Sequence, residues 1–219
     1  MSRPKIALPN ELFIISDLHI GGEYPNGLDH NADPELSGRG FRINTHVKDL
    51  IDFISEVRDR ALRIRGTTEL VINGDLVDFL AEKAVGEHGW RAFIEDEDEA
   101  VATLERIVDR DCGFFDALAA LIESGVSLTL LLGNHDIEMS LPAVRSYLRA
   151  RLGVKRFGAV QFIYDGEAYV VGDTLIEHGN RYDGWNAVDY DSLRRYRSES
   201  SRRLPLSPEA EFDPPVGSQ

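Results

Sequence analysis

The 219-residue chain has one cysteine, two methionines and no long apolar run. A single thiol cannot form an internal disulfide, which excludes a disulfide-stapled secreted framework and agrees with a reducing compartment. We expect Cys112 to be a small buried hydrophobe. No apolar stretch approaches the roughly 20 residues that span a bilayer, and the N-terminus lacks the apolar segment of a secretory signal. The sequence therefore predicts a cytoplasmic protein with no membrane partner.

Basic residues are also scarce. The chain has 24 lysines and arginines against 38 acids, for a formal net charge of −14. A protein that tracks a nucleic-acid backbone draws most of its affinity from Lys and Arg side chains on phosphates, so this composition disfavours nucleic acid as the partner. It does not exclude a phosphorylated substrate, because divalent cations held by carboxylates reverse the local field and attract anions.

Three short apolar runs, each followed by polar residues, predict buried strands, and apolar residues at helical spacing predict helices between them. The strands are expected at 12–15, 69–72 and 127–132, and the helices at 45–63, 95–110 and 114–125. Asn44 or Thr45 is the expected N-cap of the first helix. Alternating strands and helices predict an α/β fold with a largely parallel sheet, in a single domain over residues 1–219.

The second half of the chain has a different pattern. A short helix is expected from Pro142 to Gly153. Apolar and polar residues then alternate around Asp165-Gly166, a dipeptide that favours a two-residue hairpin turn, so we expect an antiparallel or mixed sheet there. Residues 198–219 contain four prolines and little apolar periodicity, which is typical of a loop or loose tail.

The functional signal is a set of acids, histidines and one asparagine that follow the three predicted strands. Open α/β sheets place ligand sites at the carboxyl ends of their strands, so these side chains are expected at one edge. Taken singly, each group is explained equally well or better by turns and caps. Three consecutive strands that end this way are an improbable coincidence. The residues are Asp17 and His19 in "SDLH", Asp75 and Asp78 in "NGDLVD", and Asn134 and His135 in "GNHD".

His178, in the stretch "IEHGNRYDGWN", is the last histidine of the chain. Taken alone, it is either a metal ligand or a histidine that caps a strand. A metal site draws ligands from several segments and no histidine follows His178, so its partners either lie upstream or are missing.

These motifs resemble those of the calcineurin-like metallophosphoesterases, over residues 12–190. The resemblance implies a β-sandwich flanked by helices, in α-β-β-α layers, with a centre of two divalent metal ions. It also implies that Asp75 bridges the ions, that His135 is the catalytic histidine and that Asp78 orients it. The other metal ligands that it implies are Asp17 and His19 for one ion, and Asn134 and His178 for the other.

The family normally closes its site with a later Gly-His-x-His motif, which this chain lacks. The resemblance therefore implies that both ions are short of protein ligands and bind more weakly. Two explanations stay open. In the first, these residues are the front part of a longer polypeptide, so that the fold is incomplete at the C-terminus and residues 198–219 lead into a missing part. In the second, the protein is naturally short, with a degenerate or partner-completed site.

The reaction that the resemblance implies is hydrolysis of a phosphoester by a metal-activated water, and a phosphomonoesterase is the expected activity. The expected substrate is a phosphorylated small molecule or a phosphoprotein. Asp, Asn and His donors accept Mn, Fe, Zn, Co or Ni, and Mn is the first expectation. Two alternatives stay open: a phosphodiesterase or nuclease of the same superfamily, and a non-catalytic binding module that keeps the fold.

Some polar residues near these motifs are weaker candidates. Arg39 and Arg42 lie in a loop rich in Gly and Arg and are candidates for a substrate phosphate, although a solvated loop is the simpler explanation. Asp183 and Asn186, soon after His178, are candidate acceptors for the second ring N–H of a metal-bound histidine. The sequence assigns Arg181 no role.

Overall fold

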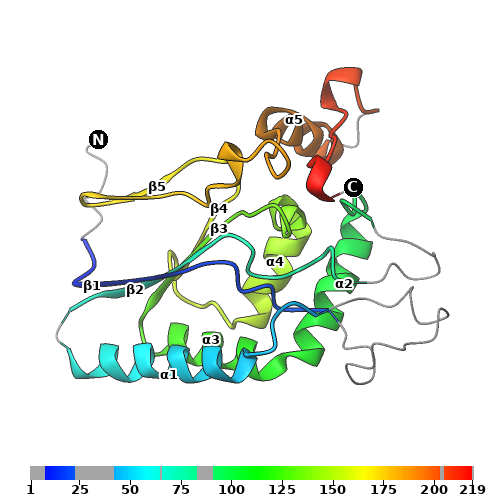
Figure 1. Cartoon of the computed structure of the whole chain (residues 1–219). Coiled ribbons are helices and arrows are strands. Elements are labelled where there is room, and N and C mark those ends of the chain that lie inside the picture. The colour runs from blue at the N-terminus through cyan, green and yellow to red at the C-terminus, as the bar shows by residue number, and fades with distance from the viewer. Residues whose placement is uncertain (1–7, 23–41, 65, 83–90, 203–204, 219) are drawn as a thin grey trace.

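A four-stranded parallel sheet is the centre of the fold in the computed structural model of the chain (Figure 1). The structure describes residues 8–22, 42–64, 66–82, 91–202 and 205–218. The four strands lie side by side in the order of the chain. They are β1 (Glu11–Ile15), β2 (Thr68–Asn73), β3 (Ser127–Leu131) and β4 (Val160–Ile163). The prediction of an α/β fold with a parallel sheet is therefore confirmed.

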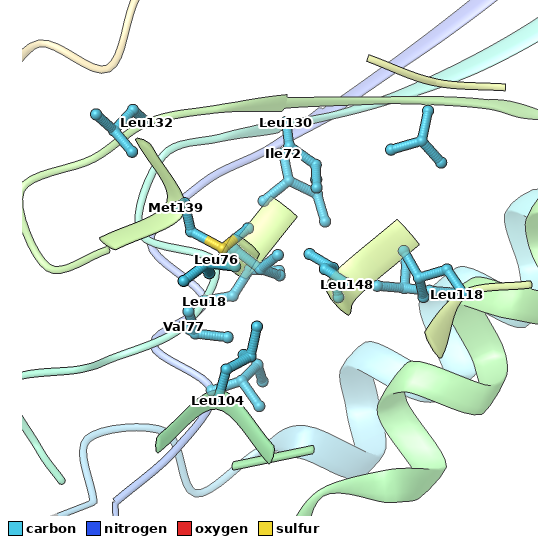
Figure 2. Packing of buried hydrophobic residues seen from close by; sticks show 14 of the residues in the cluster. Leu18, Ile72, Leu76, Val77, Leu104, Leu118, Leu130, Leu132, Met139 and Leu148 are labelled. Carbon is cyan, nitrogen blue, oxygen red and sulfur yellow. The ribbon is translucent and has the colours of Figure 1, made fainter. Parts of the chain in front are cut away.

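Helices cover one face of this sheet. These helices are α1 (Val47–Arg63), α2 (Glu97–Arg110), α3 (Cys112–Glu123) and α4 (Pro142–Arg151), whereas α5 (Tyr190–Ser201) lies away from α1 and α3, at the top of Figure 1. Of these, α1 and α3 run side by side below the sheet in Figure 1. Figure 2 shows Ile72 and Leu130 of the sheet in one core with Leu118 of α3 and Leu148 of α4. The four helices expected from apolar spacing correspond to α1 to α4.

The opposite face of the sheet packs against a two-stranded antiparallel hairpin, β5 (Tyr169–Val171) and β6 (Thr174–Ile176). Successive side chains of a strand point to opposite faces. Val71 of β2 and Leu131 of β3 therefore face the hairpin, where they form a second, smaller core with Ile176. Both faces of the central sheet are thus covered by apolar side chains.

The hairpin turn does not lie at Asp165-Gly166, where the sequence pattern predicted it. The strand before that dipeptide, β4, joins the parallel sheet beside β3, and β5 belongs to the second sheet. The turn lies instead at Gly172-Asp173, between two residues that pair across the hairpin. Gly166 has a φ of 76° and serves the connection between the two sheets, where the ring of Tyr190 leaves no room for a Cβ.

The layers are helices, a four-stranded sheet and a two-stranded sheet. The resemblance implied a further layer of helices over the second sheet. In the described part of the chain no helix covers that surface: Val170 and Leu175, which pair across the hairpin, are 60% and 64% exposed. The family fold is present, with an outer face of the second sheet that is open to solvent.

Two local expectations are wrong. Helix α1 begins after His46, and its first turn receives no side-chain cap from Asn44 or Thr45. Oδ1 of Asn44 accepts the amide of His46 at 2.7 Å, just before the helix, and Nδ2 donates to the Leu18 carbonyl at 2.6 Å, in the loop that follows β1. Cys112 is exposed rather than buried, because it lies at the first turn of α3 on the side away from the core.

The end of the chain is also more ordered than its composition predicted. Residues 198–201 complete α5, and short 3₁₀ turns at Pro208–Ala210 and Val216–Ser218 follow. Phe212 is buried, with its ring 5.2 Å from the ring of Phe93. Across the ranges that the structure describes, no helix is both long and apolar enough to cross a bilayer.

Candidate metal centre

The loops that leave β1 and β2 hold three side chains in strained backbone conformations. Asp17, His19 and Asp75 have φ angles of 57°, 44° and 52°, the positive values found for non-glycine residues in the described ranges. Each such conformation costs of the order of 1 kcal/mol and persists only where surrounding contacts hold it. All three are predicted ligands, so the strain lies where the sequence placed the site.

Backbone hydrogen bonds hold the two loops against each other. The amide of Asp17 donates to the Gly74 carbonyl at 3.2 Å, and the amide of His19 donates to the Asp75 carbonyl at 2.9 Å. Beyond the loops, Ile20 forms a parallel bridge with Val77. The pairing of β1 with β2 thus continues through the ligand residues and fixes the spacing of their side chains.

Two glycines let the segments of the site approach closely. A Cβ on Gly133 would lie 1.9 Å from Oδ1 of Asp75, and a Cβ on Gly74 would lie 2.3 Å from Nδ1 of His178. Both distances are far below van der Waals contact, so only glycine fits at either position. The glycines of "NGD" and "GNH" therefore determine how tightly the segments converge on the Asp75 carboxylate.

Asp136, the last residue of "GNHD", clamps the loops after β2 and β3 together. Its Oδ1 accepts the amide of Gly133 at 2.7 Å, and its Oδ2 accepts the amide of Leu76 at 2.8 Å. The side chain is buried, and this burial, with the added charge of Asp75, raises the pKa of Asp136 to about 7. Its two oxygens are used on backbone amides, which gives Asp136 a structural place in the site.

The carboxylate of Asp75 lies at the centre of the arrangement and is 2% exposed. Its Oδ1 accepts the amide of His135 at 2.9 Å. Its Oδ2 lies 3.3 Å from Nε2 of His178 and 3.7 Å from Nε2 of His19. Burial opposes ionisation of this carboxyl, but the hydrogen bond and charge of His178 outweigh burial and lower the pKa of Asp75. One buried carboxylate therefore faces two imidazoles.

The main chain of β2 orients the ring of His178. Its Nδ1 lies 2.7 Å from the carbonyl oxygen of Asn73, which can only accept, so Nδ1 carries a proton and donates. The other nitrogen, Nε2, faces Asp75. Metal-binding histidines typically have this arrangement, with an oxygen acceptor behind the ring. Burial lowers the pKa of His178, but Asp75 outweighs burial and raises it to about 9.

Asp78 lies behind two other histidines. Its Oδ2 is 3.2 Å from Nδ1 of His19, and its Oδ1 is 3.2 Å from Nδ1 of His135. Burial raises the pKa of Asp78, but the hydrogen bonds with His135 and His19 outweigh it and bring the pKa below its usual range. For His135, burial lowers the pKa, and the hydrogen bond and charge of Asp78 outweigh burial and raise it. Both rings thus use Nδ1 on Asp78 and keep Nε2 available.

Two groups of ligand atoms share Asp75. One group is His19, Asp75 and His135, the other is Asp17, Asp75 and His178, and within each group the ligand atoms lie within 4.8 Å of one another. The groups divide the residues differently from the resemblance, because Asp17 lies with His178 and His19 lies with His135. In both divisions Asp75 is the shared member.

Asn134 lies in the same loop, between the clamped Gly133 and His135. Its side chain is buried and has no hydrogen-bond partner in the part of the chain that the structure describes. Its amide oxygen suits a hard cation.

The weaker candidates have other partners. Arg39 lies outside the described residues. Arg42 is largely buried and donates to Asp111, with Nη1 3.0 Å from Oδ2, so the explanation as a solvated loop residue is wrong. Arg181 lies 3.3 Å from a carboxylate oxygen of Glu177.

Asp183 and Asn186 do not support His178. Asp183 accepts from the side chain of Asn186 at 2.7 Å, and both residues are on an exposed turn. The hypothesis that either accepts the ring N–H was wrong, because the carbonyl of Asn73 does so. A main-chain acceptor leaves no signal in a sequence, so this support could not be found from the residue pattern.

Glu82 is another supporting residue that the sequence pattern missed. Its Oε1 accepts the amide of Gly22 at 2.7 Å and lies 2.5 Å from Nη1 of Arg110. These contacts fix the chain three residues after His19 to α2. The acid four residues after Asp78 carries no motif of its own, and only its burial marks it.

Comparison with known proteins agrees with this geometry. A family model described as calcineurin-like phosphoesterase matches residues 12–212, a range that includes every residue of the candidate site. A search of curated proteins found no match. The matched family is one of metal-dependent phosphoester hydrolases, and the described residues contain two candidate groups of metal ligands. The chain therefore belongs to the calcineurin-like phosphoesterase family.

Proposed function

We propose that the protein is a phosphomonoesterase that works with two divalent metal ions held around Asp75. The observation that carries this proposal is the convergence of two ligand groups on one buried carboxylate. Backbone strain at Asp17, His19 and Asp75 supports it, because such strain is retained chiefly at functional sites.

The proposed ligands beside Asp75 are Asp17, His19, Asn134 and His178. They fit divalent ions, because carboxylate, imidazole and amide donors together suit Mn, Fe, Zn, Co or Ni. The imidazoles of His19 and His178 present Nε2 while Nδ1 is bound to an oxygen behind the ring. When bound, such a pair of ions lowers the pKa of a water molecule and holds the phosphoryl oxygens. We propose Mn as the first ion to test.

His135 is the proposed proton donor to the leaving oxygen. Its side chain is 24% exposed, so a substrate can reach it. Asp78 holds Nδ1, so the N–H at Nε2 points outward. Asp78 also raises the pKa of His135, which favours the protonated ring that a proton donor needs. A histidine so placed gives up its proton as the leaving oxygen gains charge.

The proposed substrate is a phosphorylated small molecule or a phosphoprotein. The net charge of −14 disfavours a nucleic-acid polymer, whose binding needs basic side chains along its backbone. A small anionic ester contacts the protein only at the site, where bound cations reverse the negative field.

Parallel assays with p-nitrophenyl phosphate and bis-p-nitrophenyl phosphate, in the presence of Mn²⁺, test the proposal. We expect the monoester to have the higher kcat/KM and Asp75→Asn to remove the activity. Faster turnover of the diester would make the protein a phosphodiesterase. No turnover of either ester, together with no bound metal, would make it a non-catalytic module.

A further inference from the structure

A cluster of arginines lies beside the candidate metal centre, at the carboxyl end of β4. The amide of Leu132 donates to the Ile163 carbonyl at 2.9 Å, so the chain at Tyr164 lies one strand spacing, about 5 Å, from the loop after β3. Asn134 lies two residues further along that loop. Tyr164 and Asp136 also line the same small internal cavity. Tyr164 is therefore a neighbour of the centre along one edge of the sheet.

Two arginines from different helices stack on the ring of Tyr164. The guanidinium carbon of Arg145, in α4, lies 3.7 Å from the ring centroid, and that of Arg197, in α5, lies 4.6 Å from it. Both arginines also donate from Nη1 to the carbonyl of Ser140, which Arg197 meets at 3.2 Å. The ring and this carbonyl hold two positive charges close together.

Neither guanidinium has a carboxylate partner. Among the residues that the structure describes, no Asp or Glu oxygen lies within 4.0 Å of the nitrogens of Arg145 or Arg197. This is unusual in a chain with 38 acids and 24 basic residues. Within the described ranges, Nη2 of each arginine makes no hydrogen bond to the protein and touches solvent. Burial lowers the pKa of Arg145, and the charge of Arg197 adds to this effect.

Polar atoms at the same place are left unsatisfied. Ser140 is fully buried and its Oγ has no partner, and Nε of Arg197 is also buried without one. An unsatisfied buried donor costs about 1–3 kcal/mol. The Tyr164 ring and the more distant charges of Glu97 and Asp165 offset part of the repulsion between the two guanidinium groups. A role in packing alone still leaves Ser140 Oγ and Arg197 Nε unsatisfied.

We propose that Arg145 and Arg197, positioned by Tyr164 and Ser140, bind a second anionic group of the substrate, a phosphate or a carboxylate. The inference rests on the proposed function, because the ester end of the same molecule lies at the metal centre. Guanidinium groups bind such anions through paired N–H donors. The substrate class is then a phosphoester that carries a second anionic group, separate from the scissile phosphate.

Three related sugars separate this class from simple monophosphates. Glucose 6-phosphate has one anionic group, 6-phosphogluconate adds a carboxylate, and glucose 1,6-bisphosphate adds a phosphate. We expect the wild-type protein to have a higher kcat/KM for at least one of the doubly anionic sugars than for glucose 6-phosphate. In Arg197→Met this preference should fall by about tenfold or more, since one charge-assisted pairing is lost. Whichever sugar shows the loss identifies the anion.

Arg194→Met is the matched control, because Arg194 lies on the same helix but pairs with Asp191 at 2.9 Å. Its preference for the doubly anionic sugar should stay within about twofold of wild type. Arg197→Lys keeps the charge and should retain part of the preference, so it serves as a second test if Arg197→Met has a folding defect. Thermal unfolding shows whether each variant is folded. An equal loss for all three sugars, or an unchanged preference in Arg197→Met, would overturn the inference.

Failure of the proposed function is separable from failure of this inference. If the protein hydrolyses none of the sugars, calorimetric titration with glucose 1,6-bisphosphate and 6-phosphogluconate tests whether the two arginines bind an anion. We expect binding of one of them to weaken by about tenfold in Arg197→Met and to stay unchanged in Arg194→Met. No binding to the wild-type protein, or equal affinity in all variants, would contradict the proposal.

Discussion

Asp78 serves a candidate ligand and the candidate proton donor with a single carboxylate. One oxygen faces His19 and the other faces His135, both at 3.2 Å. The two rings meet edge to face with centroids 4.6 Å apart. The orientation of the proposed donor is therefore coupled to that of the proposed ligand, and only substitution of His135 itself separates the two roles.

Replacing His135 by alanine tests whether it acts on protons or on metal. We expect His135→Ala to lower kcat by about 10²–10⁴-fold, the usual contribution of a positioned acid, while bound metal stays close to the wild-type amount. The measurement combines steady-state kinetics with metal analysis of the same sample. His46→Ala is the control, because the His46 side chain is exposed and lies 3.2 Å from Asp49, outside the candidate centre. Parallel loss of metal and activity would instead make His135 a ligand, as its grouping with His19 and Asp75 allows.

Glu138 gives a pH-dependent test of stability away from the proposed ligands. Its carboxyl is buried, accepts the amide of Ile94 at 2.8 Å, and burial raises its pKa to about 8 from an ordinary 4.5. A raised folded-state pKa contributes stability that is complete below pH 4.5 and is lost as the pH rises to about 8. Glu138→Gln keeps the acceptor oxygen but cannot ionise.

We therefore expect Glu138→Gln to be more stable than wild type at pH 8, by about 1 kcal/mol or more, and to gain little at pH 4.5. Urea unfolding at the two pH values measures the difference. Equal effects at both would show that this carboxyl is ionised and satisfied in the folded protein.

At the scale of elements, the site depends on how closely the loops after β2 and β3 approach. Gly133→Ala would put a methyl group against the Asp75 carboxylate, at a position 1.9 Å from Oδ1. We expect this variant to lose most of its bound metal and at least about 2 kcal/mol of stability, because the carboxylate has to leave its place. Metal analysis and urea unfolding measure both effects.

Gly113→Ala is the matched control for that substitution. Gly113 lies in α3, and a Cβ there meets only Ile51, at an ordinary 3.5 Å. Alanine favours a helix over glycine by about 1 kcal/mol, so this variant should be as stable as wild type or more so, with full metal content. Normal metal binding by Gly133→Ala would show that the approach of the two loops is not needed.

The elements also show what the sequence could predict. Apolar periodicity located the first three strands and four helices, since each has to bury one face. The turn at Asp165-Gly166 was assigned wrongly, because local turn chemistry does not say which sheet the next strand joins. The site residues were predicted from motifs at strand ends. The acceptor behind His178 and the Leu18 acceptor for Asn44 are both backbone carbonyls, and only the three-dimensional structure brings these contacts together.

At the scale of the whole molecule, an acidic chain gathers several carboxylates at one edge of its sheet. Asp75, Asp78 and Asp136 are all buried there, and the charge of Asp75 raises the pKa of Asp136, so these two carboxylates repel each other. Cations that bind only the folded protein stabilise it by mass action, by about 2.7 kcal/mol at a hundredfold excess over Kd. Metal binding and overall stability are therefore expected to be coupled.

Removal of metal should lower the thermal stability of the whole protein. We expect chelation followed by dialysis to reduce Tm by about 5–10 °C, and added Mn²⁺ to restore it. Differential scanning calorimetry measures the shift, and Asp75→Asn, which lacks the shared carboxylate, should show little response. A Tm that ignores both chelator and Mn²⁺ would indicate that the folded protein holds no stabilising ion.

The metal content of the purified protein tests the dinuclear centre most directly. After reconstitution with Mn²⁺ and dialysis, elemental analysis should give about two ions per wild-type chain, and well below one in Asp75→Asn, because both ions share that carboxylate. Circular dichroism would verify that the variant is folded. No bound metal in the wild-type protein, or equal amounts in the wild type and Asp75→Asn, would contradict a metal centre built on Asp75.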